Sequence, residues 1–112
     1  MDKTQPSPSK KWSENNVLLE ASKIINPDSD REQTYGEPSK NLECIAGMWE
    51  SYLMSRGLLD PCGSGILASD VALMMVLLKV ARLANSPDHV DSQVDICGYT
   101  ALLERIQKEG KR

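Results

Sequence analysis

Four charged residues stand at helical spacing on either side of a short turn: Lys79, Arg82, Asp91 and Asp95. The two cations interrupt the apolar run 71–83, and they project from nearly the same side of a helix because they are three residues apart. The two aspartates, four residues apart, also share a face. Helices joined by a short turn are antiparallel neighbours. We therefore expect the four side chains to lie close together.

Two kinds of chemistry fit this arrangement. A buried cation without a partner costs several kcal/mol, so the carboxylates would form a partly buried ion-pair network that fixes the register of the helices. Alternatively, the paired carboxylates bind Mg²⁺, which prefers oxygen ligands and bridges to substrate phosphates. The two cations would then bind phosphate directly. The same four residues support both interpretations.

The composition favours a helical protein and argues against several classes. The 112 residues include no Phe and only 4% aromatic residues, so the core must be aliphatic. A net charge of -3 without a long basic block argues against nucleic-acid binding. No apolar run reaches the roughly 18 to 20 residues of a membrane span, and the segment "MDKTQPSPSKK" lacks the apolar stretch of a secretory signal, so we expect a cytoplasmic protein. Three cysteines without CxxC spacing and one histidine argue against zinc.

The apolar periodicity predicts an all-α fold with no strands. A single helical domain is expected over residues 12–108, with disordered tails over residues 1–11 and 109–112. Its four predicted helices cover residues 13–25, 38–54, 69–84 and 91–108.

The third predicted helix raises a packing problem. Ser69 is its expected N-cap and Asp70 lies in its first turn, where a carboxylate is favourable. A helix that is apolar on every side must be covered on every side. Because one short chain cannot do this alone, we expect a homo-oligomer, first of all a dimer.

Other side chains have simpler interpretations. Tyr52 belongs to the apolar stripe of the second helix and is expected to pack on the core. Cys44 and Cys97 lie among apolar neighbours and are predicted to be buried. His89, in a turn before a helix, is expected to be a local hydrogen-bonding or solvated residue rather than a catalytic base.

Three segments carry a resemblance: "REQTYGEPSKNLECIAGMWESYL", "DVALMMVLLKVARL" and "DSQVDICGYTALL". Together they resemble a family of small phage and prophage proteins known only as a domain of unknown function. More distantly, the helix order is similar to that of the all-α MazG-like nucleotide pyrophosphohydrolases. This resemblance implies a four-helix MazG-like bundle, a nucleotide ligand, Mg²⁺, and the cytosol of a host cell as the place of action.

The resemblance implies that Asp91 and Asp95 form an acidic metal-binding pair, to which we add Glu43. The E-x-x-E pair usual on the earlier helix of those enzymes is missing, because Glu43 and Glu50 are seven residues apart. The predicted ligand- and phosphate-binding residues are Lys79, Arg82, Arg31, Tyr35, Asn41 and Tyr99.

Tyr35 has two interpretations. It could stack on a base, with Arg31 and Asn41 hydrogen-bonding the ligand from either side. The favoured alternative is a tight turn in which Gly36 takes a positive φ.

Three functions remain open. The first is nucleotide-phosphate binding, with Mg²⁺-dependent pyrophosphohydrolysis as its enzymatic form. The second is a phage protein that sequesters a nucleotide without chemistry, as a sponge against host defence. The third is a helical adaptor whose charged cluster is purely structural.

Overall fold

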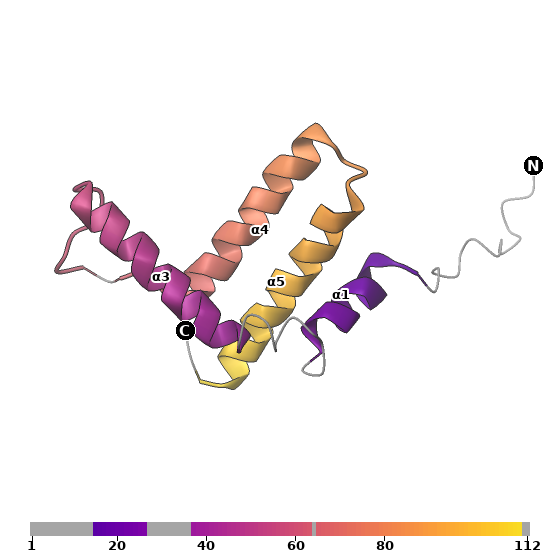
Figure 1. The fold of residues 1–112 in the computed structure, drawn as a ribbon, viewed down its shortest axis with the longest axis horizontal. Coiled ribbons are helices and arrows are strands. Elements are labelled where there is room, and N and C mark those ends of the chain that lie inside the picture. Colours follow the sequence, from indigo (N-terminus) through magenta and orange to yellow (C-terminus); the bar gives the residue numbers. More distant parts are fainter. Residues whose placement is uncertain (1–14, 27–36, 64, 111–112) are drawn as a thin grey trace, which may run out of the picture.

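The computed structural model describes residues 15–26, 37–63 and 65–110. This part of the chain contains helices and no strands, which confirms the all-α prediction. Its helices are α1 (Val17–Ile25), α3 (Pro38–Ser55), α4 (Ala68–Asn85) and α5 (Val90–Lys108). The antiparallel α4 and α5 lie side by side, α1 packs on α5, and α3 crosses the beginning of α4 and then points away (Figure 1).

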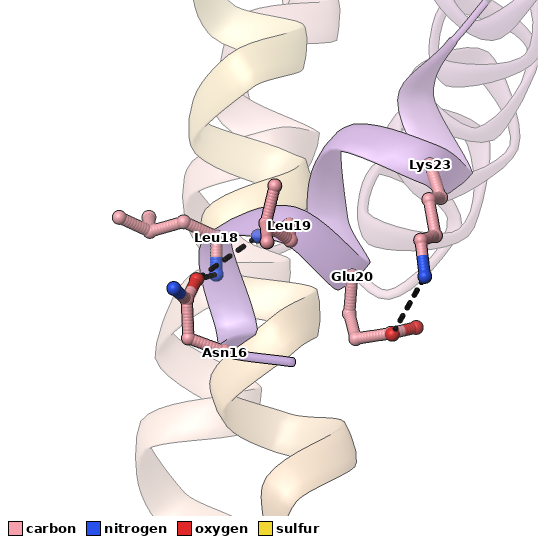
Figure 2. A network of polar contacts seen from close by, with 5 residues as sticks. All are labelled: Asn16, Leu18, Leu19, Glu20 and Lys23. Atoms are coloured by element: carbon pink, nitrogen blue, oxygen red, sulfur yellow. Dashed lines mark hydrogen bonds and ion pairs between the residues drawn. The ribbon is translucent and has the colours of Figure 1, made fainter. Parts of the chain in front are cut away.

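Helix α1 is short and is fixed at its start by a side chain. Asn16 has an extended backbone, and its Oδ1 accepts hydrogen bonds from the N–H groups of Leu18 and Leu19 at 2.9 and 3.1 Å. One turn on, Lys23 Nζ lies 3.2 Å from Glu20 Oε1 (Figure 2). An N-cap of this type satisfies N–H groups that have no partner within the helix. The predicted tail 1–11 lies outside the described residues.

The ends of α3 follow from its sequence. Pro38 stands in the first turn, where its missing N–H is not needed. Gly57, with φ of 70°, ends the helix, because a residue without Cβ adopts this backbone at no steric cost. The N–H groups of Gly57 and Leu58 then donate to the carbonyls of Met54 and Leu53 at 3.0 and 2.9 Å.

The predicted start of α4 needs a correction. The N-cap is Leu67 and not Ser69, so the helix begins two residues earlier than predicted. Asp70 lies in the first turn as predicted, and its Oδ2 accepts the backbone N–H of Leu67 at 2.8 Å. The N-cap residue Leu67 is therefore held by a side chain from the first turn of the helix. At the other end of the domain, Glu109 and Gly110 form a turn after α5, and residues 111–112 are not described.

The buried core is small and joins α3, α4 and α5 where they cross. It consists of Leu42, Ala46, Ala68, Val71, Ala72 and Ile106. Three of these six are alanines, which lets the helix backbones approach closely. Helix α1 adds Ala21, and its Ile25 lies over Gly98 of α5.

Two packing predictions on α3 are wrong. Tyr52 is 60% exposed, and Cys44 is exposed as well. Cys44, two residues from both Leu42 and Ala46, lies on the opposite side of α3, whereas Tyr52 comes after Trp49, the last side chain of the stripe that packs on the core. Cys97 on α5 is half-buried.

The side of α4 that faces away from α3 and α5 is apolar and exposed. We call it the outer face of α4, and it consists of Leu73, Met74, Leu77, Leu78, Val80, Ala81 and Ala84. The five larger side chains are between 43% and 66% exposed. Among the helices described, none is long and apolar enough to cross a membrane. The expected oligomer stays a prediction.

Candidate functional site at the α4–α5 turn

The central feature of the site is an ion pair between α4 and α5. Lys79 Nζ lies 3.0 Å from Asp95 Oδ2, and the two side chains are only 12% and 26% exposed. This contact confirms that the end of α4 lies beside the beginning of α5. The lysine is accommodated between helices because a carboxylate neutralises it there.

The beginning of α5 is fixed by local hydrogen bonds. His89 is the N-cap, and its Nδ1 accepts the backbone N–H of Ser92 at 3.3 Å. The Ser92 hydroxyl lies 2.7 Å from the same nitrogen and is fully buried. Gln93 Nε2 donates to the Pro87 carbonyl at 3.0 Å. These bonds set the orientation of the turn that precedes Asp95, and they confirm the local role predicted for His89.

Arg82 and Asp91 do not join the buried pair. Both side chains are exposed at the end of the helix pair nearest the turn. Neither forms an ion pair with another residue in the described part of the chain. Of the predicted four-residue network, the described structure thus has one partly buried ion pair, Lys79–Asp95, with Arg82 and Asp91 as separate exposed charges near it.

The remaining predicted site residues are distributed over the molecule. Tyr99 is half-buried on α5, one turn after Asp95. Asn41 and Glu43 are exposed on α3, whose first half packs on residues 68–72 of α4. At 1.5 Å per residue, ten residues of α4 place that contact about 15 Å from Arg82. Arg31 and Tyr35, and with them the proposed turn at Gly36, lie outside the described residues.

The predicted magnesium ligands do not fit a metal site. No group of three His, Cys, Asp or Glu side chains comes together in the described part of the chain. Asp91 and Asp95 are thus not joined by Glu43, which belongs to the distant α3. One oxygen of Asp95 also faces the Lys79 ammonium group, and a cation already in contact opposes a second one. We derive no chemical step through Mg²⁺.

An open groove of about 610 Å³ lies away from the charged cluster, between Ile25 of α1 and the last turns of α5. Its charged lining is paired along the helix. Lys108 Nζ lies 3.1 Å from Glu104 Oε1, and Arg105 Nε lies 3.2 Å from Glu109 Oε1. The four-residue spacing of both pairs was visible in the sequence, but nothing there indicated a groove. Its balanced charge favours no class of ligand.

The chain has recognisable relatives. A family model described as a domain of unknown function, DUF6378, matches residues 16–107. The chain belongs to the DUF6378 family. The resemblance to a phage family of unknown function is thereby confirmed, and the motifs that carried it lie within the matched residues.

Two phage proteins are similar to this DUF6378 chain. The gene 55 protein of Mycobacterium phage L5 is 41% identical over 91 residues, which cover 81% of this chain and 52% of the phage protein. The gene 55 protein of Mycobacterium phage D29 is 34% identical over 93 residues, covering 83% and 54%. The chain thus spans about half the length of these relatives. No solved structure matches it.

Proposed function

We propose that this DUF6378 protein binds the phosphate of a nucleotide at the end of the α4–α5 pair, through Arg82. The observation that carries the proposal is the exposed guanidinium of Arg82, which has no carboxylate partner among the described residues. A guanidinium is always charged and presents a planar set of donors that matches phosphate oxygens.

Lys79 and Asp95 have a positioning role in this proposal. Their ion pair at 3.0 Å holds α4 against α5, so Arg82 extends from a helix that is fixed one turn earlier. Lys79 has three N–H donors, of which Asp95 takes one, and a phosphate beside Arg82 would take another. Tyr99, half-buried one turn beyond Asp95, would contact the ligand from α5.

The proposal is for binding and not for hydrolysis. The distant similarity to MazG-like enzymes supports a nucleotide as the ligand, but the carboxylates predicted to bind Mg²⁺ do not gather in the described structure. The non-catalytic form, in which a phage protein sequesters a nucleotide in the host cytosol, is the one that these residues support.

The test is a calorimetric titration of the purified chain with ATP, dATP and adenosine, with Mg²⁺ and with EDTA. We expect both triphosphates to bind and adenosine to bind much less. Arg82→Gln should weaken triphosphate binding about 10- to 100-fold, since a hydrogen bond to a charged group contributes about 1.5 to 3 kcal/mol. Arg56→Gln, at an exposed arginine at the end of α3, is the matched control and should change nothing.

A competing function is the helical adaptor. It is favoured by the direct neutralisation of Lys79 by Asp95, which explains the buried charges without any ligand. If the wild type binds neither triphosphate under either condition, or if Arg56→Gln weakens binding as much as Arg82→Gln, the nucleotide proposal is wrong and the adaptor is retained.

A further inference from the structure

The outer face of α4 is unusual for a surface because it contains no charge. Its members recur along more than three turns of one helix, and all of them are aliphatic or Met. Polar residues border the face: Ser69 and Asp70 at its beginning, Asn85 at its end, and the exposed Arg82 one turn after Leu78. Among the helices labelled in Figure 1, only α5 lies along the length of α4. Lys79, which contacts Asp95 of α5, is on the other side of α4 from Leu73 and Leu77.

The size of the face is what a small dimer requires. Side chains exposed by 43% to 66% leave on the order of 500 Å² of apolar surface, the upper range for a patch on a monomer. Two such faces together would bury at most on the order of 1,000 Å², about the smallest area expected of a biological interface. The outer face of a second copy is therefore large enough to cover the exposed outer face of the first.

Side-chain sizes along the face fix the orientation of that copy. The large Leu73 and Met74 lie toward the beginning of α4, and the small Ala81 and Ala84 toward its end. In an antiparallel pair centred between residues 77 and 78, the large Met74 of one copy lies at the level of the small Ala81 of the other, and Leu73 lies at the level of Arg82 at the edge of the face. In a parallel pair, large side chains would meet large ones and a gap would remain between the alanines.

The polar ends agree with the same orientation. An antiparallel pair with this centre places Asp70 of one copy at the level of Asn85 of the other, where an amide can donate to a carboxylate. A parallel pair would place the two Asp70 carboxylates together, and they would repel. We propose that the outer face of α4 is a symmetric dimer interface in which two α4 helices of the same chain pack antiparallel. This inference depends on neither Arg82 nor a nucleotide.

The first test compares three leucine substitutions by sedimentation equilibrium, from low to high micromolar concentration. The wild type should have the mass of two chains. Leu77→Glu places a carboxylate near the symmetry axis in both copies and should raise the dissociation constant at least about 100-fold. Leu58→Glu and Leu18→Glu are the controls, because these leucines are 65% and 67% exposed, against 66% for Leu77, and lie off the face. Both controls should remain dimeric, with helix content checked by circular dichroism.

The second test addresses orientation. Ala81→Leu should weaken an antiparallel dimer, because the larger side chain meets Met74 of the other copy. The double variant Met74→Ala/Ala81→Leu exchanges large and small and should restore most of the affinity. Three results would overturn the inference: a wild type that is monomeric at high micromolar concentration, a Leu77→Glu variant that stays dimeric, or Ala81→Leu tightening the dimer. A monomeric wild type would mean that the outer face of α4 binds a different protein and not a second copy of this chain.

Discussion

The two sides of α4 invert the usual relation between polarity and burial. On the inner side, Lys79 is 12% exposed, whereas on the outer side Leu77 is 66% exposed. The lysine is inside because α5 brings Asp95 to it at 3.0 Å. The leucine is outside because α3 and α5 together cover only one side of the helix. Burial is thus decided by which neighbour is present, and the apolar side of α4 is the one that no other described helix covers.

Side-chain volume separates the two sides as well. The inner side begins with Ala68, Val71 and Ala72, which are buried where α3 and α5 approach closely. The outer side has Leu73, Met74 and Leu77 over the same part of the helix, and these would hold a neighbouring helix further away there. The inner side is therefore built for close crossing within the chain, and the outer side for contact along a whole helix.

The largest effect is expected from breaking the ion pair. Asp95→Ala leaves the Lys79 ammonium between helices without a counter-charge and should lower the free energy of unfolding by about 2 to 3 kcal/mol, since the pair is largely but not fully buried. Chemical denaturation followed by circular dichroism measures this. The control is Glu104→Ala, which breaks an exposed pair with Lys108 and should cost under about 0.5 kcal/mol. If Asp95→Ala and Glu104→Ala lower the free energy of unfolding equally, the Lys79–Asp95 pair is no more important for stability than an exposed ion pair.

A smaller effect should separate the apolar residues of the two sides. Val71→Ala deletes fully buried methyl groups and should cost about 2 kcal/mol. Leu73→Ala, on the outer face, should cost under about 0.5 kcal/mol when both are measured in the monomeric Leu77→Glu background. In the dimeric wild type, Leu73→Ala should additionally weaken self-association. A large loss from Leu73→Ala in the monomer would mean that the outer face is covered within the chain.

Much of this architecture could be predicted from the sequence. The helices follow from apolar periodicity together with residues such as Pro38 that favour a helix start. The Lys79–Asp95 contact follows from a short turn, which forces the two helices to be antiparallel. Such features depend on residues close in sequence, where spacing determines geometry.

The errors concern contacts that depend on where other helices end. Tyr52 continues the apolar stripe of α3, but α3 extends beyond the neighbours that could cover it. Glu43 was predicted to join Asp91 and Asp95, but α3 crosses α4 at the end far from those aspartates. Periodicity defines a face and its direction along one helix, but not the point at which a second helix crosses it.

The smallest effect on stability is expected at the N-terminus of α4, which precedes both the inner and the outer side of the helix. The sequence favoured Ser69 as the cap, but the structure has the Asp70 carboxylate accepting the Leu67 N–H at 2.8 Å. Asp70→Ala should therefore cost about 1 kcal/mol, whereas Ser69→Ala should be nearly neutral. Thermal and chemical unfolding in the Leu77→Glu background exclude any contribution of Asp70 to the dimer. If Ser69→Ala is the more destabilising of the two, α4 begins where the sequence predicted, and the carboxylate of Asp70 acts only at the interface.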